Sequence, residues 1–483
     1  MKKRPSKNVL SRRDFVVSSA GAALALPLVL QGCAQGPAAL DPSDPQFWDK
    51  GTPIAWDPEA IPLDETLFPC GTHAGAMHST SAIFWCYATE ESPKRLKVWR
   101  EGGTEGQVVL VNEGDVETDQ GYIKVEVTGL APGTWYRFTF LAADESARSA
   151  IANVRTALGE ESMEPLTIAA TTCTHYNHRP YKALEVAAKH DYDVFCQLGD
   201  MTYNDGALTR EEFRVRWRET LADPGYRAIM EKAGLYATMD DHEIADDSDR
   251  YGLPEEVYES GKQAFLEALA IPEAEGGRFW ESFRWGKTAE FFVLDCRTER
   301  DPMSTFSENQ VYISQKQMDW LKDGLKASPC VFKIILNSVP ILGFTDLWPE
   351  VMDRWQAFPD QRDELLDFIL GEEISSVFFL TGDYHLGYAA RLEPSGPRSA
   401  IWEIMVGPGC PRIPNPLVNL FAFDPEAKPE MCPEGQFDYI GNRYAATLMT
   451  FDPKSKKVHV RYLDYETEEV LYEGELTMGL AES

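Results

Sequence analysis

The chain has 483 residues, of which 43% are hydrophobic and 11% aromatic, so it can bury large cores and is not a disordered chain. Its 46 Lys and Arg residues stand against 77 Asp and Glu residues, and the net charge of −31 argues against a stable nucleic-acid partner. Any site for an anionic ligand therefore needs its own local positive charge, which bound metal ions supply most readily.

The N-terminus has the features of an export signal. Residues 1–32 carry six basic residues and one acidic residue, and the run SRRDFV at 11–16 resembles a twin-arginine signal. The run LQGC at 30–33 resembles a lipobox, in which Cys33 becomes a lipidated N-terminus. The sequence therefore predicts a partnership with the twin-arginine translocase during export. It also predicts a lipid anchor at Cys33 that holds the protein to a membrane, facing the periplasm or the cell exterior. An uncleaved anchor is the alternative.

Two segments of different character follow the signal. Residues 33–65 are rich in Pro, Asp and Ala, which is typical of a tether. Residues 66–158 contain short runs of alternating apolar and polar residues between turns, at 81–87, 96–99, 122–127 and 135–140. The turn before the last of these runs resembles that of fibronectin-type domains. The sequence therefore predicts a small all-β sandwich of the fibronectin or immunoglobulin type over 66–158.

Strand-like and helix-like runs alternate between residues 165 and 476. Apolar strand signals lie at 166–170, 192–198, 235–239, 289–295, 331–336 and 377–380. Helical signals lie at 180–190, 209–221, 254–270, 314–326 and 359–371. This rhythm predicts a layered α/β domain over 165–476.

Four of the cysteines are candidates for two disulfide bonds. Cys410 and Cys432 flank a Pro-rich loop and are candidates for a bridge, and Cys70 and Cys86 are candidates for a second bridge. The remaining cysteines in apolar runs are interpreted as small buried hydrophobic residues.

Polar residues with metal-ligand chemistry follow the predicted strands of the α/β domain. In such sheets, ligands bind beyond the carboxyl ends of the strands, so these residues are expected to converge. They lie in the runs TCTH at 172–175, GDMTY at 199–203, DDHE at 240–243, DCRTER at 295–300, NS at 337–338 and GDYH at 382–385.

This series resembles the calcineurin-like metallophosphoesterases, and more closely their PhoD-like (alkaline phosphatase D) family. In that family a Cys replaces the first Asp of the superfamily pattern, and a Tyr stands three residues after the Asp of the Gly-Asp pair. Cys173, Asp200 with Tyr203, the DDHE run and Asp383 with His385 match that variant. The resemblance implies a two-sheet, layered core flanked by helices behind the small β-sandwich.

The resemblance also implies a metal centre. Cys173, Asp200, Tyr203 and His385 would bind a ferric ion, and thiolate, phenolate, carboxylate and imidazole form a donor set suited to iron. Asp200 would bridge to calcium, which Asp241, Asn337 and Asp383 would also hold through oxygen atoms. Iron and calcium are favoured over zinc and manganese.

The remaining candidate residues lie close to these ligands in the sequence. His175 is a further ligand or a hydrogen-bonding pocket residue, and Asp246 would make a calcium site more anionic. His242 is the preferred general acid, because a protonatable group near the leaving oxygen lowers the cost of expelling an alkoxide. Arg297 or Arg300 is a candidate phosphate contact, with Arg297 taken as the catalytic candidate and a plain salt bridge as the alternative.

The sequence thus predicts an exported metal-dependent hydrolase of phosphate mono- or diesters, acting through a metal-activated oxygen nucleophile. One alternative is an enzyme of the phosphodiesterase or phospholipase kind with little monoesterase activity. A second alternative, of another class, is a non-catalytic surface-binding lipoprotein.

Overall fold

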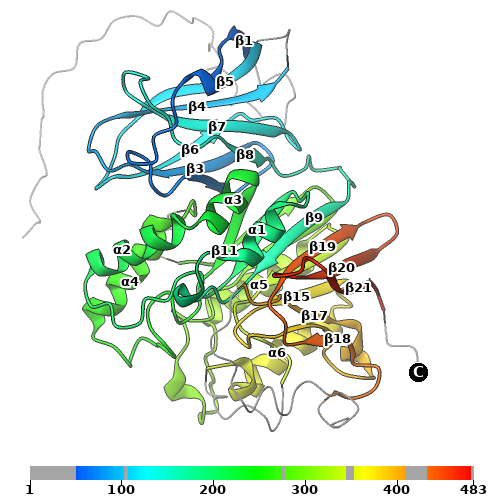
Figure 1. The fold of residues 1–483 in the computed structure, drawn as a ribbon. Helices are drawn as coiled ribbons and strands as arrows, with labels where there is room; N and C mark the ends of the chain where they lie inside the picture. Colours follow the sequence, from blue (N-terminus) through cyan, green and yellow to red (C-terminus); the bar gives the residue numbers. More distant parts are fainter. Residues whose placement is uncertain (1–50, 103–106, 273–277, 344–352, 410–431, 480–483) are drawn as a thin grey trace, which may run out of the picture. The chain divides into compact units, whose positions relative to one another are not determined.

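Three β-sheets and the helices around them make up the described part of the chain (Figure 1). The computed structural model describes residues 51–102, 107–272, 278–343, 353–409 and 432–479, and all of these belong to one unit, Pro42–Ser483. Among these residues, every helix is too short or too polar to span a bilayer. The predicted signal, Cys33 and most of the predicted tether lie outside the described residues.

The N-terminal sandwich consists of a five-stranded sheet that faces three strands of a larger sheet. Phe84 on one side and Phe138 on the other meet with ring centroids 4.7 Å apart. The five-stranded sheet has the order β1 (Thr52–Ala55), β5 (Gln107–Val116), β4 (Lys94–Glu101), β7 (Trp135–Ala142) and β8 (Ala152–Arg155), and the facing strands are β2 (Thr72–Gly75), β3 (Ser81–Tyr87) and β6 (Tyr122–Thr128). The predicted all-β layer pair is confirmed.

The predicted boundary of the tether at residue 65 is wrong. Thr52–Ala55 forms β1, which pairs antiparallel with β5 along its whole length. Residues of the Pro-rich segment are therefore already part of the sandwich, because the edge of β5 offers unpaired backbone groups that a short strand satisfies.

A nine-stranded sheet joins the sandwich to the α/β part of the chain. Its order is β21 (Val470–Thr477), β20 (Lys457–Asp464), β19 (Ala445–Asp452), β9 (Leu166–Thr171), β10 (Val194–Leu198), β11 (Gly234–Thr238), β2, β3 and β6. The join is the parallel pairing of β11 with β2, where Leu235 lies opposite Gly75. A Cβ atom at Gly75 would lie 2.3 Å from the carbonyl oxygen of Ala270, so this approach requires glycine.

A seven-stranded sheet covers the other face of the α/β core. Its order is β12 (Glu281–Trp285), β13 (Ala289–Val293), β14 (Phe332–Leu336), β15 (Val377–Thr381), β17 (Trp402–Met405), β16 (Gly387–Arg391) and β18 (Phe437–Gly441). Successive residues of its central strands point to opposite faces. Phe291, Ile334 and Phe378 belong to the core between the two sheets, and Phe292, Ile335 and Phe379 belong to a second core under the helices.

The helices flank these two sheets on their outer faces, as the sequence predicted for the five segments with helical periodicity. They are α1 (Lys182–Ala188), α2 (Arg210–Leu221), α3 (Pro224–Lys232), α4 (Glu255–Ala268), α5 (Gln315–Ala327) and α6 (Pro359–Gly371). Thr209 and Glu212 form a capping box that starts α2. The sequence analysis missed α3, which Asp223 caps directly after α2.

The predicted bridge between Cys70 and Cys86 is wrong. Both are free, buried thiols: the Cys70 Sγ donates to the Arg218 carbonyl oxygen, and the Cys86 Sγ donates to that of Gly71. Each thiol therefore satisfies its donor locally. The other predicted bridge involves Cys410, which lies outside the described residues.

Candidate active site

Loops that follow parallel strands of both sheets bring the predicted polar side chains together. Strands β9, β10 and β11 run parallel in one sheet, and β13, β14 and β15 run parallel in the other. Arg297 in the loop after β13 pairs with Asp240 in the loop after β11, so the two sets of loops meet at the same end of the core. This is the end where open α/β sheets bind ligands.

Four of the predicted ligand residues have a left-handed backbone. The φ angles are +54° at Cys173, +53° at Asp200, +75° at Asp383 and +55° at His385. A residue other than glycine in this region costs on the order of 1–3 kcal/mol, and such residues concentrate at functional sites. This strained backbone conformation sets the direction in which the four side chains project.

The first group of ligand atoms comes from three separate loops. Atoms of Cys173, Asp200 and His385 lie within 4.8 Å of one another. The Tyr203 hydroxyl donates to the Oδ2 of Asp200 at 3.0 Å, so the phenol oxygen also adjoins this group. Cys173, Asp200 and Tyr203 are buried. These are the four residues predicted to hold iron.

A second group shares Asp200 with the first. Atoms of Asp200, Asp241 and His242 lie within 4.8 Å of one another, and all three residues are buried. One carboxylate thus belongs to two candidate cation sites, which is the arrangement of a bridging ligand.

Two buried arginines neutralise other carboxylates of the site. Arg297 pairs through its Nε with Asp240, and it contacts Asp241 at 3.4 Å and Asp353 at 3.3 Å. The Nε of Arg354 donates to the Oδ2 of Asp383 at 2.6 Å. The ion-paired state of Arg297 is thus present in the structure, and its predicted contact with phosphate stays a prediction.

The donor set suits a bound cation. The buried Oδ1 of Asp200 and Oδ2 of Asp240 have no hydrogen-bond partner among the described residues. Burial raises the pKa of both carboxyl groups, and neighbouring carboxylates raise it further. Burial and the charge of Asp200 likewise raise the pKa of the Cys173 thiol and the Tyr203 phenol. A cation among these groups would replace the protons that the crowded acids otherwise hold.

Glu243 ties the loop after β10 to the loop after β11. Its Oε1 accepts the backbone N–H groups of Met201 at 2.6 Å and Thr202 at 3.3 Å. Its Oε2 accepts those of Asp200 at 3.1 Å and Asp240 at 2.8 Å. This buried carboxylate therefore fixes the backbone from which Asp200 projects.

His242 is held by a carboxylate that the sequence analysis did not single out. Its Nδ1 lies 2.9 Å and 3.1 Å from the two carboxylate oxygens of Asp205. Its Nε2 lies 3.4 Å from the Oδ1 of Asp246, an exposed residue. Burial opposes the charged imidazolium, but Asp200, Asp241 and the bond to Asp205 raise the pKa of His242 to about 10.

Two predicted ligands have other contacts in the structure. The Oδ1 of Asn337, through which it would bind calcium, accepts the Cys296 thiol at 2.9 Å and lies 3.4 Å from the Trp355 indole nitrogen. The Nδ1 of His175 accepts the backbone N–H of Asn177, and its ring lies 4.5 Å from that of Tyr203. His175 therefore packs against Tyr203, one of the candidate iron ligands.

Residues that support the site without resembling ligands were not predictable from the sequence. Asp205, Asp353 and Arg354 lie in loops, where neither periodicity nor position after a strand distinguishes them. Asp240 belongs to the DDHE run, but no role was predicted for it. Its buried Oδ2 has no hydrogen-bond partner among the described residues, so Asp240 is a further candidate ligand.

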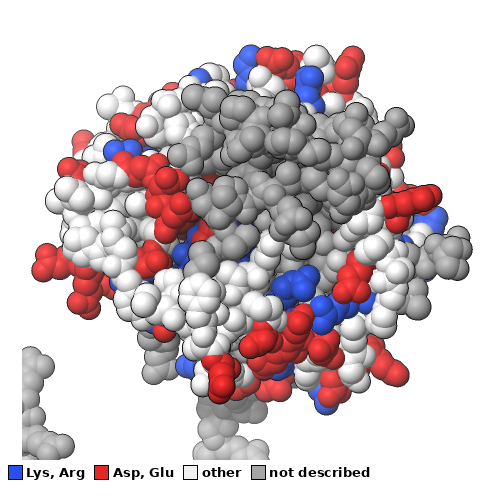
Figure 2. Space-filling view, turned by 90° about the horizontal axis from the view of Figure 1, so that it is seen from below, with Lys and Arg blue, Asp and Glu red and all other residues white. Residues whose placement is uncertain are grey.

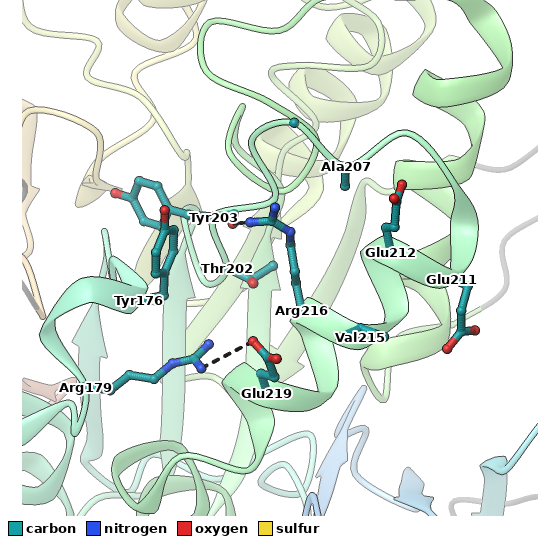
Figure 3. Close-up of a pocket in the computed structure, with 11 residues that line it drawn as sticks. Tyr176, Arg179, Thr202, Tyr203, Ala207, Glu211, Glu212, Val215, Arg216 and Glu219 are labelled. Carbon is teal, nitrogen blue, oxygen red and sulfur yellow. Dashed lines mark hydrogen bonds and ion pairs between the residues drawn. The ribbon is translucent and has the colours of Figure 1, made fainter.

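A cavity of about 530 Å³ lies beside the loop after β10 (Figure 3). Residues of α2 form one wall, with Arg216 and Glu219 among them, and Tyr176 and Tyr203 lie together on the opposite side. Arg179 pairs with Glu219 at 3.6 Å, and Arg216 donates to the Tyr203 carbonyl oxygen. Since Tyr203 also borders the first ligand group, this cavity adjoins the candidate metal site.

Known proteins resemble the chain in sequence and in fold. Residues 168–410, just over half of the chain, match the family model of the PhoD-like phosphatases. Alkaline phosphatase D of Bacillus subtilis (strain 168) is 24% identical over 440 residues, which cover 80% of this chain and 73% of that protein.

Two solved structures share the fold. The structure of PhoD aligns with a TM-score of 0.72 at 18% identity, over 85% of this chain and 89% of that chain. Purple acid phosphatase PPD1 from yellow lupin (Lupinus luteus) seeds aligns with a TM-score of 0.59 at 12% identity, over 88% and 74% of the two chains.

Proposed function

Because the chain belongs to the PhoD-like phosphatase family and is thus a phosphoric ester hydrolase, we propose that it hydrolyses phosphate mono- or diesters with iron and calcium. The observation that carries this proposal is the position of Asp200. Its carboxylate belongs to two groups of candidate ligand atoms, in which every residue except the half-buried His385 is buried, and its Oδ1 has no partner among the described residues.

The two groups differ in the kind of cation that they suit. Cys173, Asp200, Tyr203 and His385 would hold a ferric ion, since thiolate and phenolate stabilise a trivalent, redox-active metal. Asp200, Asp241 and Asp383 offer oxygen atoms, which suit calcium, with Asn337 as a neutral oxygen donor. When bound, such cations polarise the phosphoryl oxygens and make water a better nucleophile.

The protein's own residues supply the remaining steps. Water attacks phosphorus in line, and the bond between phosphorus and the leaving oxygen breaks with its electron pair on that oxygen. His242 donates a proton to the leaving oxygen, and the Asp205 carboxylate at its Nδ1 favours the protonated imidazole. Arg297, released in part from its carboxylates, would contact the phosphate through its guanidinium fork.

Metal analysis combined with an ester panel tests the proposal. We expect elemental analysis of the purified protein to find iron and calcium, and the protein to hydrolyse aryl and alkyl phosphates. A calcium chelator should abolish activity reversibly while iron stays bound, because all-oxygen calcium sites exchange readily. Full activity after exhaustive chelation, or zinc in place of both metals, would contradict the metal assignment.

The same panel decides between monoesters and diesters. Activity confined to diesters would favour the phosphodiesterase alternative, in which the second ester group is required for binding.

We further propose that the enzyme is exported by the twin-arginine route and anchored through Cys33, on the basis of the N-terminal runs alone.

A further inference from the structure

Asp205 makes a specific set of contacts around His242. Both of its carboxylate oxygens lie within 3.1 Å of the Nδ1 of His242, and its Oδ1 also accepts the backbone N–H of Asp246 at 2.7 Å. Asp205 is partly exposed, whereas the His242 side chain is only 6% exposed. The carboxylate thus reaches inward from the loop after β10 to a buried imidazole.

We propose that Asp205 is a positioning residue that fixes the tautomer and orientation of His242, so that Nε2 faces the leaving oxygen of the substrate. This inference rests on the proposed function, in which His242 supplies the proton to that oxygen. An ionised carboxylate only accepts hydrogen bonds, so Nδ1 must carry a hydrogen to make this contact. The reactive proton is then the one on Nε2.

Ring packing adds a second constraint on the imidazole. The Tyr203 ring lies 4.0 Å from the His242 ring at an interplanar angle of 34°, and the His175 ring contacts Tyr203 from another direction. A ring flip would exchange Nδ1 for a carbon at Asp205 and lose its bond to the carboxylate. Packing against Tyr203 therefore fixes the plane of the ring, and the contact with Asp205 selects one of its two orientations.

The other ring nitrogen, Nε2, faces Asp246, which is exposed. Nε2 and the Asp246 Oδ1 are 3.4 Å apart, a longer distance than that between Nδ1 and Asp205. Nε2 can therefore meet a substrate without breaking the bond at Nδ1. In the step itself, the proton moves from Nε2 to the leaving oxygen, while the Nδ1 proton stays on the ring. The proton lost by the attacking water restores the imidazolium.

The test compares two esters that differ in their need for a proton. A p-nitrophenolate ion leaves readily without protonation, whereas an alkoxide does not. We expect Asp205→Ala to lower kcat for an alkyl phosphate by about 100-fold, the lower bound for loss of general acid catalysis, and for the p-nitrophenyl ester by less than tenfold. KM and the bound metals should remain unchanged. Asp205→Asn retains an oxygen that accepts from Nδ1, so it should recover part of the alkyl rate.

Nuclear magnetic resonance gives a readout that does not depend on activity. In the wild-type protein the Nδ1 proton of His242 should exchange slowly and be visible, and it should disappear in Asp205→Ala. Asp249 provides a matched control, because it accepts the backbone N–H groups of Tyr251 and Gly252 in a nearby loop and pairs with no imidazole of the described part of the chain. Asp249→Asn should leave both the ester ratio and the resonance unchanged.

The outcomes separate this inference from the proposed function. If His242→Ala slows both esters equally, the proton-donor role of His242 fails, and the inference fails with it. If His242→Ala discriminates between the esters but Asp205→Ala does not, only the positioning role is overturned. Loss of metal in Asp205→Ala, with equal loss on both esters, would also overturn it and make Asp205 a support of the metal site.

Discussion

Asp200 is the side chain on which most constraints of the site converge. Its backbone has a left-handed φ, its amide is held by Glu243, and one carboxylate oxygen accepts the Tyr203 hydroxyl. The other oxygen is buried and unpartnered among the described residues. A buried carboxylate oxygen without a partner is costly, which supports the proposal that Asp200 binds a cation.

Tyr203 offers the sharpest residue-scale test. A ferric ion bound to a phenolate shows ligand-to-metal charge transfer, so the purified protein should be visibly coloured. Tyr203→Phe should shift or bleach the absorption band and weaken iron binding at least tenfold, because one anionic ligand is lost. Absorption spectroscopy with elemental analysis measures both effects.

Tyr192 is the matched control for this change. It is also a buried tyrosine, its hydroxyl has no partner among the described residues, and it precedes β10 at the end opposite the site. Tyr192→Phe should leave colour and iron unchanged. A colourless, fully active wild-type protein that contains zinc would overturn the ferric assignment, since zinc has a filled d shell.

At the scale of elements, Glu243 joins two loops through four backbone N–H groups, two on each oxygen. In Glu243→Gln, the amide nitrogen must face two N–H donors whichever way the side chain turns. We expect a loss of stability of roughly 1–3 kcal/mol from unsatisfied buried donors, together with weaker metal binding. Chemical denaturation and metal titration check the two effects.

Glu212, on α2, is the control for the change at Glu243. Its Oε2 alone accepts the N–H groups of Leu208 and Thr209, so a glutamine can present its oxygen there, as capping boxes allow. Glu212→Gln should therefore cost only a few tenths of a kcal/mol. Equal effects at the two positions would argue against the role of Glu243 as a double acceptor.

His73 links the sandwich to the segment after α4 in a pH-dependent way. Its Nε2 accepts the backbone N–H of Ala270, its ring stacks on Trp85, and burial lowers its pKa to about 3. The unfolded chain takes up a proton below pH 6.5, and the folded chain does not until about pH 3. Stability from this group is therefore full above pH 6.5 and falls as pH drops, by about 2 kcal/mol between pH 6.5 and 5.

Urea unfolding at the two pH values measures this loss. His73→Gln carries no titrating ring, so its free energy of unfolding should change less between pH 6.5 and 5 than that of the wild type. The partly exposed His459 on β20 is the control, and His459→Gln should retain the wild-type pH dependence. Identical pH profiles for wild type and His73→Gln would sink this account.

The elements that the sequence predicted are those with strong periodicity. The six apolar runs form β9, β10, β11, β13, β14 and β15, and the acids directly after them lie in the candidate site. The pairing of β2 with β11 was not predictable, because it rests on a long-range contact at Gly75 that leaves no local pattern. Asp205 and Glu243 were missed as supports for the same reason: apart from the Asp240 N–H that Glu243 accepts, their partners lie 37 or more residues away in the chain.

At the scale of the whole molecule, the charge of the chain bears on the proposed attachment to a membrane. The full chain has a net charge of −31, and residues 1–32 carry a net charge of +5. The rest of the chain therefore has a net charge of −36. Figure 2 shows carboxylate side chains in clusters over one face, with Lys and Arg among them. Such a charge repels anionic lipid headgroups, so attachment would depend on the lipid at Cys33 rather than on the protein surface.

Cys33→Ser tests this dependence. The change removes the only predicted lipidation site, while the described unit, which already includes β1 at Thr52–Ala55, retains every candidate site residue. We therefore expect the mature protein to move from the membrane fraction to the soluble fraction with its specific activity unchanged. Replacing Arg12 and Arg13 by Lys should instead leave the precursor unexported, which separates failed anchoring from failed export. A wild-type protein found in the soluble fraction, or a Cys33→Ser variant that stays with the membrane, would refute the lipid anchor without touching the phosphoesterase site.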